Sequence, residues 1–297
     1  MKKLRRHPRI LIGGTVLAVL VLLSLTASLI APFDPIKLNV AMRLKPPSGT
    51  HWFGTDAYGR DVLTRTLYGG RISLVIAVSV AALATILGTA IGLVAGYFRR
   101  MDTVVMRVMD GLMAIPGILL AVAMLSLSKA SVQTVILAIT IPEIPRVVRL
   151  VRAVVLSIRE QAFVEGAVAS GTRPPRILFR HILPNAISPV FVSAAFSVAG
   201  AIVTESALSF LGFGVPPPTP SWGELLKQAD ENWRVAWWLV TFPGIAIFVT
   251  VVAFNLVGQA LRRFRAGRRG ALLVLQLCQR FLQRHRQHGA LTRRLAA

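Results

Sequence analysis

Long apolar runs dominate the chain and alternate with short polar and basic segments. A helix needs about 20 mostly apolar residues to cross about 30 Å of hydrocarbon. Six runs meet this requirement, so we predict an all-α integral membrane protein with six transmembrane helices. The predicted spans are Ile10–Ala31, Ile72–Phe98, Val105–Leu127, Val132–Leu150, Ala186–Phe213 and Val235–Leu256. A tight hairpin, Ser128–Ser131, separates the third span from the fourth.

The first run has two interpretations. It follows the basic segment MKKLRRHPR, which is typical of a cleaved signal peptide. Its apolar stretch is about 22 residues long, however, whereas the apolar region of a signal peptide has about 7–15 residues. We therefore favour a retained anchor helix.

The composition agrees with a membrane protein. Hydrophobic residues make up 54% of the chain and charged residues 15%, below the roughly 25% of soluble domains. The net charge of +22 could indicate a nucleic-acid partner, but cytoplasmic loops of membrane proteins also collect Lys and Arg. We expect no nucleic-acid partner. The single cysteine, Cys278, excludes an intrachain disulfide framework.

The distribution of basic residues predicts the orientation. With the N-terminus inside, 25 of the 34 Lys and Arg residues fall in cytoplasmic segments. The positive-inside rule therefore favours an inner-membrane protein with both termini in the cytoplasm. Two further patterns fit packed spans. Gly88, Gly92 and Gly96 repeat every four residues and predict a flat helix face for close packing. Aromatic residues mark the membrane interfaces: Trp233, Trp237 and Trp238 outside, and Tyr97 and Phe98 inside.

The cytoplasmic segment Phe163–Ala186 reads FVEGAVASGTRPPRILFRHILPNA and lies between apolar runs. Ser157 and Glu160 have the spacing of a capping box, which predicts a short helix over Ala162–Ser170. Gly171 suits the left-handed position that ends such a helix.

A second helix is predicted after this glycine. Pro174 and Pro175 are tolerated in a first helical turn, and the helix should end before Pro184. A protruding, sharply turned helix pair would allow a partner to move the spans that it joins. On physical grounds alone, an amphipathic helix lying on the membrane fits equally well.

The same segment resembles the EAA loop of ABC-importer permeases. EGAVASG, followed by HILP, matches the spacing of that motif, and RHILPNA resembles its variant in the dipeptide/oligopeptide/nickel branch. Gly166 stands where the motif usually has Ala. The resemblance implies ATPase coupling by Glu165, Gly166, Ala167, Gly171, His181, Leu183 and Pro184.

Four other stretches resemble the C-type permease subunit of that branch, in the same order. They are HWFGTDAYGRDVLTRTLYGGRISL, AIPGILLA, ESALSFLGFGVPPPTPSWGELL and FPGIAIFVTVVAFNLVG. The resemblance runs from the N-terminus to about Leu261. It implies a type I ABC importer permease fold with a cytoplasmic coupling helix.

The resemblance also implies partners. It predicts a homologous second permease, two ATP-binding cassette ATPases and a periplasmic binding protein, all working in a lipid bilayer. ATP and Mg would act on the ATPases, and this chain would carry no cofactor, metal or catalytic residue. The expected substrates are peptides, peptide-like solutes or nickel complexes, among which the sequence does not choose.

Motif absences agree with a subunit that does not catalyse a reaction. The sequence contains no Gly-Lys-Ser/Thr of a P-loop, no HExxH and no GxSxG. A secondary transporter remains a rival, but no repeat of the expected kind is evident. A membrane enzyme is a second rival, although the five His residues are scattered outside the spans.

Three acids lie within or beside predicted spans, where acids usually face a cavity or a partner. Asp110 and Glu143 are expected to pair locally with Arg107 and Arg146. For Glu205, pore lining and structural hydrogen bonding remain open.

The outer segment after Glu205 is interpreted as the periplasmic mouth, where the binding protein docks, in preference to a plain connector. Its candidate residues are Ser221, Trp222 and Gly223, with Ser221 and Glu224 at capping-box spacing.

We divide the chain into three parts. Residues 1–71 form the anchor helix and a periplasmic segment, residues 72–261 form the permease core with five spans, and residues 262–297 form a basic tail. The tail departs from the resemblance. An interfacial amphipathic helix is one interpretation, but we favour a disordered or loosely membrane-associated segment without function.

Overall fold

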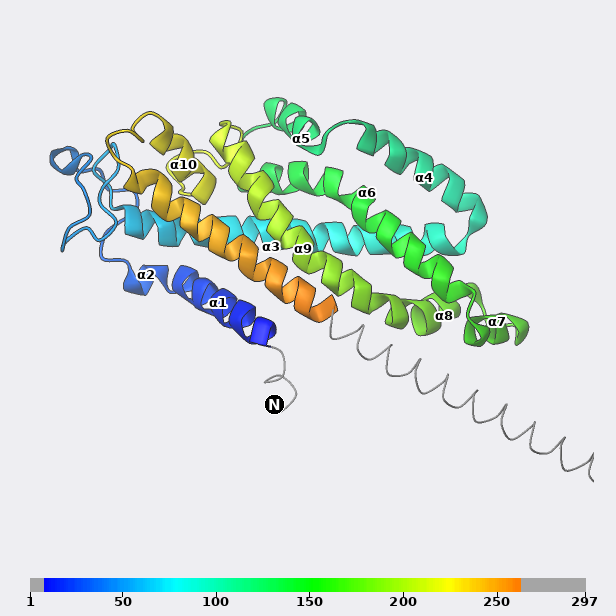
Figure 1. Ribbon diagram of the computed structural model, residues 1–297. Helices are drawn as coiled ribbons and strands as arrows, with labels where there is room; N and C mark the ends of the chain where they lie inside the picture. The colour runs from blue at the N-terminus through cyan, green and yellow to red at the C-terminus, as the bar shows by residue number, and fades with distance from the viewer. Residues whose placement is uncertain (1–7, 263–297) are drawn as a thin grey trace, which may run out of the picture.

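The computed structural model describes residues 8–262, and the regular elements in that range are helical (Figure 1). They are α1 (Pro8–Leu25), α2 (Ala27–Ile30), the 3-10 turn η2 (Val40–Met42), α3 (Val62–Tyr97), α4 (Arg99–Ala114), α5 (Gly117–Ser126), α6 (Val132–Arg159), α7 (Ala162–Ala169), α8 (Pro174–Ile177), the π-helical turn η3 (Leu178–Ile182), α9 (Leu183–Phe210), α10 (Trp222–Asp230) and a last helix, Trp238–Arg262.

Helix α3 is the central element of the bundle. It begins where the Asp61 side chain accepts a hydrogen bond from the Thr64 amide at 2.8 Å, which caps the first turn. At a rise of about 1.5 Å per residue, its 36 residues extend over about 54 Å. It packs along both α6 and α9, and the predicted boundary at residue 71 falls within it.

The predicted glycine ridge is confirmed as a packing surface. A Cβ atom added to Gly88, Gly92 or Gly96 would lie 2.6 to 2.7 Å from the Cβ atom of a valine on α6. These valines, Val147, Val151 and Val155, have the same spacing of four and are buried. The absence of side chains on one helix therefore lets the other helix approach its backbone closely.

The third predicted span is not one continuous helix. Val105–Leu127 divides into α4 and α5, which meet at an angle of 80° around Ile115–Pro116. Pro116 has no amide hydrogen to continue the helix, and it disfavours helical geometry at the residue before it. The apolar character of the run concealed this break.

The other predicted spans coincide with helices, but their ends differ. α3 starts ten residues before Ile72, α6 continues past Leu150 to Arg159, and the last helix is shifted to Trp238–Arg262. The first span is interrupted after α1. By length and composition, three described helices could cross a membrane, or four if α4 and α5 form one bent span.

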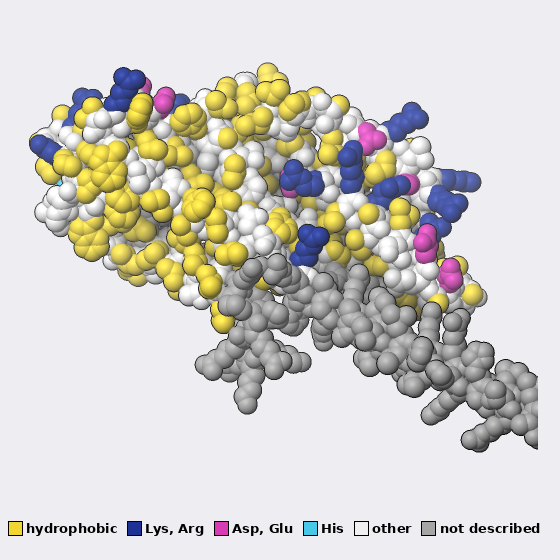
Figure 2. Space-filling model, viewed as in Figure 1, with side chains coloured by type: hydrophobic (Ala, Val, Ile, Leu, Met, Phe, Trp, Pro, Cys, Tyr) yellow, Lys and Arg dark blue, Asp and Glu magenta, His cyan; other side chains and the backbone are white. Residues whose placement is uncertain are grey.

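The bundle has two distinct ends. The loop from α2 to α3, α10 and the start of the last helix lie together at one end, and α7 and α8 project at the other (Figure 1). Hydrophobic side chains cover much of the middle of the face drawn in Figure 2, while Lys and Arg gather most densely toward the end that carries α7. This pattern fits an apolar belt within a bilayer.

The tryptophans differ in their surroundings. Trp233 and Trp237 are exposed, as an interfacial position requires. Trp238 is instead buried, and its indole Nε1 donates to the Thr55 carbonyl oxygen at 3.1 Å. The prediction that all three meet headgroups is therefore wrong for Trp238, whose indole joins the last helix to the loop before α3.

Candidate functional site

The predicted cytoplasmic loop forms a helix, a glycine break and a second helix. α7 ends before Gly171, which has a φ of +72°, the left-handed conformation expected for it. α8 begins with Pro174 and Pro175 in its first turn. The predicted capping box is wrong, however, because Ser157 lies inside α6, and the break falls at Glu160 and Gln161.

Pro184 does not end the second helix. Pro174–Phe210 forms one continuous helix of 37 residues, in which η3 makes the wider π-helical turn immediately before Leu183 and Pro184. A proline within an α-helix removes one hydrogen bond and its ring crowds the carbonyl four residues earlier. A π turn at this position provides room for the ring. The side-chain amide of Asn185 donates to the His181 carbonyl oxygen at 2.7 Å.

The loop has a buried side and an exposed side. Val164 is its buried anchor on α7, packed with Val155 and Ile158 of α6 and with Ile177 and Ile182 from the second helix. The exposed side carries the Glu165 and Gly166 positions and large apolar side chains. These are Phe163, Val168 and Phe179, with exposed fractions of 45%, 54% and 67%. Large apolar side chains exposed at a protruding end are typical of a protein contact.

The residues predicted to couple to the ATPases do not form one cluster. Glu165, Gly166 and Ala167 lie on α7, Gly171 lies in the break, His181 in η3, and Leu183 and Pro184 begin α9. Leu183 and Ala167 both pack against the apolar cluster behind the loop. The Phe163 and His181 rings lie 6.5 Å apart and connect α7 with the second helix.

At the opposite end, Glu205 lies in a buried joint. It has no exposed surface, and its two carboxylate oxygens accept hydrogen bonds from Ser209 at 2.8 Å and from Ser73 at 3.1 Å. The Ser73 hydroxyl also accepts from the Trp222 amide at 3.2 Å. The joint therefore connects α3, α9 and α10 through structural hydrogen bonds.

Ser221, Trp222 and Gly223 belong to the same joint. Ser221 caps α10 by accepting from the Glu224 amide, as its spacing predicts. The indole of Trp222 is buried and donates to the Thr66 carbonyl oxygen at 2.9 Å. A Cβ on Gly223 would lie 2.6 Å from the Ser206 Cα, so only glycine permits this approach of α10 to α9. These side chains hold α10 in place and are not exposed.

A buried network of ion pairs lies beside this joint, and the sequence analysis did not predict it. Arg65 of α3 has no exposed surface and donates to Glu224 of α10 at 2.8 Å. Arg60 donates to Asp56 at 2.7 Å and to Gln228 at 2.8 Å. Burial raises the pKa of the Glu224 carboxyl, and the positive charges of Arg65 and Arg60 oppose that shift.

Three other acids, Asp102, Asp110 and Glu143, pair with arginines of α6. Glu143 pairs with Arg146 at 3.2 Å, as predicted. The local partner predicted for Asp110 is wrong, because its carboxylate accepts from Arg149 at 2.6 Å and not from Arg107. α4 lies beside α6, so the nearer partner in space is the more distant one in sequence. Asp102 makes a similar bidentate contact with Arg152.

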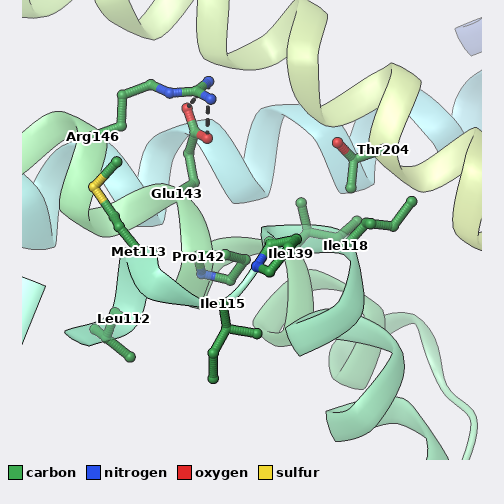
Figure 3. A pocket seen from close by; sticks show the side chains of 11 residues that line it. Leu112, Met113, Ile115, Ile118, Ile139, Pro142, Glu143, Arg146 and Thr204 are labelled. Atoms are coloured by element: carbon green, nitrogen blue, oxygen red, sulfur yellow. Dashed lines mark hydrogen bonds and ion pairs between the residues drawn. The ribbon is translucent and has the colours of Figure 1, made fainter. Parts of the chain in front are cut away.

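A cavity of 330 Å³ opens where α4 and α5 meet α6 and α9 (Figure 3). Its lining combines apolar side chains, among them Ile115, Ile118 and Ile139, with the charges of Glu143 and Arg146. A second cavity of 490 Å³ adjoins the same ion pair and reaches Val80 of α3 and Asn255 of the last helix. The Glu143–Arg146 ion pair thus lines both cavities.

Comparison with known families identifies the class of protein. The model of the family described as binding-protein-dependent transport system inner membrane component matches residues 88–268, which include α7, η3 and the residues that line the first cavity. The chain belongs to this family. A model of the N-terminal transmembrane domain of oligopeptide transport permease C matches residues 1–47. The protein is therefore a permease subunit of an ABC importer and a multi-pass membrane protein.

Curated relatives agree over most of the permease. A probable peptide ABC transporter permease of Sinorhizobium fredii is 48% identical over 87% of this chain and 88% of its own length. A dipeptide transport system permease of Alkalihalophilus pseudofirmus is 39% identical, covering 88% and 86%. A glutathione transport system permease of Pectobacterium atrosepticum is also 39% identical, covering 87% and 86%.

A solved structure confirms the fold of the permease. The MetNI methionine ABC transporter in an inward-facing conformation superposes with a TM-score of 0.55 at 16% identity. The match covers 66% of this chain and 96% of the other. The fold is thus that of a type I ABC importer permease, as the resemblance implied.

Proposed function

We propose that this permease imports peptides or peptide-like solutes together with a homologous second permease, two ATPase subunits and a periplasmic binding protein. ATP and Mg would act on the ATPases, and this chain would contribute the membrane path and the coupling loop. The names of the relatives support a peptide class of substrate, since they include peptide, dipeptide and glutathione permeases.

The observation that carries the coupling role is the set of exposed apolar side chains on the projecting loop. Phe163, Val168 and Phe179 present apolar surface beside Glu165, although the loop is anchored from behind by buried Val164. In addition, a groove of 590 Å³ that is lined by Glu165 and Val168 lies between α7 and the ends of α3 and α6. A partner that binds this groove and these side chains would bury apolar area and contact a loop that is fixed to the bundle.

The loop is mechanically connected to the spans. α7 is joined to α6 by a short break, and α8 continues through η3 into α9 without interruption. In our proposal, closure of the ATPases on ATP pushes α7, and the bundle changes from inward-facing to outward-facing. The helices are then the two-state element that such coupling requires. ATP hydrolysis resets the bundle.

The orientation follows from the same proposal. An ATPase is cytoplasmic, so α7 and both chain termini lie in the cytoplasm and α10 lies at the periplasmic face. The basic residues near α7 agree with this orientation (Figure 2). The joint around Glu205 and the network around Arg65 would then hold α10 as a rigid surface for the binding protein.

Glu165→Arg and Gly171→Arg test the coupling role. Both should abolish ATP-driven uptake and weaken association with the ATPases while leaving membrane insertion intact, because both positions are exposed and have no core to disrupt. Uptake is measured in proteoliposomes and association by affinity purification.

The controls separate charge from backbone geometry. Gly171→Asn retains a residue that tolerates positive φ, and Glu231→Arg places the same charge at the opposite, exposed end of the molecule. Both should associate normally with the ATPases. Normal uptake and ATPase binding in Glu165→Arg and Gly171→Arg would refute the docking assignment.

A further inference from the structure

The ion pair between Glu143 and Arg146 lies at membrane depth, yet it is open to the surroundings. The Arg146 side chain is 69% exposed, and that of Glu143 is 17% exposed. Val80 lines the 490 Å³ cavity beside the pair and lies well inside the apolar stretch of α3. Charged groups in such positions face a water-filled cavity or a partner because contact with lipid is costly.

The carboxylate is also held in a fixed position. The Ser197 hydroxyl of α9 donates to Glu143 Oε1 at 2.8 Å, and Arg146 Nη1 lies 3.3 Å from the same oxygen and 3.2 Å from Oε2. Pro142 and Pro145 flank Glu143 within α6. The Arg146 guanidinium is held less firmly. Among the described residues its one acidic partner is Glu143, and the Arg146 side chain projects beside the cavity (Figure 3).

The surroundings are suited to a solute with both charges and apolar groups. The cavity between α5, α6 and α9 combines apolar walls from Ile115, Ile118 and Ile139 with the hydroxyl-bearing Thr204 and the ion pair. A peptide has an ammonium group, a carboxylate and apolar or amide surface between them. The Glu143 carboxylate complements the first and the Arg146 guanidinium complements the second.

We propose that Glu143 and Arg146 form a charge-reading site in the solute path, which contacts the charged groups of a peptide during translocation. This inference rests on the proposed peptide-import function. It assigns opposite effects to the two residues: Arg146 favours acidic groups and Glu143 favours basic groups. The intact pair is therefore nearly neutral toward peptides of either charge.

The test measures charge selectivity within one sample. The complete complex, with its ATPases, second permease and binding protein, is reconstituted in proteoliposomes. It is supplied with ATP and a mixed pool of peptides of two to five residues from a protein hydrolysate. Imported peptides are identified by mass spectrometry, and the ratio of Lys-containing to Glu-containing peptides is calculated. Because this is a ratio from one preparation, differences in assembly or ATPase rate cancel.

We expect Arg146→Gln to raise this ratio and Glu143→Gln to lower it, each by about tenfold, as for the loss of one charge-assisted contact. The matched controls are Arg149→Gln and Asp110→Asn, which change an arginine–carboxylate pair between α6 and α4 whose residues line neither cavity. They should leave the ratio within about twofold of the unsubstituted complex.

A second measurement applies even if a neutralised variant fails to assemble. In a Cys278→Ser background, Thr204→Cys should react rapidly with a water-soluble methanethiosulfonate, because it lines the cavity. Val78→Cys is its control, because Val78 is exposed on α3 but lines neither cavity.

The outcomes are distinguishable. Failure of the unsubstituted complex to import any peptide overturns the peptide-import function itself. Import with an unchanged ratio in Glu143→Gln and Arg146→Gln overturns the site, as does an equal shift in the controls. Slow labelling of Thr204→Cys, at or below the rate of Val78→Cys, also overturns it, because the pair would then face a protein partner or lipid.

Discussion

Single glycines set the distance between α3 and α6. A Cβ on Gly92 would lie 2.7 Å from the Val151 Cβ and 2.9 Å from the Val148 carbonyl oxygen. Neither the valine side chain nor the α6 backbone can move away without a cost in free energy. A Cβ added to Gly111 on α4 would meet no other atom within 4 Å. The two glycines therefore make a matched pair in which only one is constrained by packing.

We predict that Gly92→Ala destabilises the protein by about 1–3 kcal/mol through overpacking. Gly111→Ala should be neutral or stabilising, because alanine favours helix. Thermal unfolding of the detergent-solubilised protein measures both. Equal melting temperatures for Gly92→Ala and the unsubstituted protein would contradict the ridge.

At the end of the bundle that carries α10, buried charges stabilise the protein only as pairs. Glu224→Gln removes the negative charge that faces fully buried Arg65, and it should lower stability by about 3 kcal/mol, as expected when one partner of a buried pair is lost. The double variant Arg65→Met with Glu224→Leu should lose less, because no charge is then left unpaired. Glu231→Gln, on an exposed residue next to α10, is the control. A double variant less stable than Glu224→Gln would contradict this account.

Residue-level signals explain which features were predictable. Gly171, Pro174 and Ser221 act through their own backbone or the next turn, so their roles follow from local sequence. Arg65 and Glu224 are 159 positions apart, and no local pattern pairs them. The Asp110 prediction failed for the same reason, since its partner comes from a neighbouring helix.

At the scale of elements, hydrophobicity locates helices better than it locates their breaks. The run over Val105–Leu127 satisfies the length of a span, yet Pro116 divides it into α4 and α5. Conversely, Pro184 looked like a stop, and η3 allows the helix to continue past it. Whether a proline ends, bends or only widens a helix depends on the packing around it, which the sequence does not state.

The short helix α7 gives an element-scale prediction. Gly166 has open space around its Cβ position, so Gly166→Ala should strengthen α7 by about 1 kcal/mol and slow its amide hydrogen exchange by about fivefold. Gly171→Ala should have the opposite effect, because a left-handed φ of +72° strains alanine, which lacks the tolerance of Asn for this conformation. Hydrogen exchange monitored by mass spectrometry resolves both. Faster exchange in Gly166→Ala would show that α7 is not held as a helix.

At the scale of the whole molecule, the two ends of the bundle have different tasks. One end is closed by buried hydrogen bonds and ion pairs that join α3, α9 and α10. The other end presents an exposed, anchored loop. Between them, the pair Glu143–Arg146 lies beside two cavities. In the proposed assembly, the end that carries α10 faces the periplasm, the ion pair lies along the solute path, and the ATPases bind the exposed loop.

Identification of the bound partners tests this account most directly. The full chain, tagged and purified in mild detergent from its native membrane, is analysed by quantitative mass spectrometry. We predict stoichiometric recovery of one homologous permease and of P-loop ATPases, with the ATPases lost in Glu165→Arg. Recovery of the chain alone, under conditions that preserve other ABC complexes of the same membrane, would contradict the proposed assembly and favour a transporter that works without an ATPase.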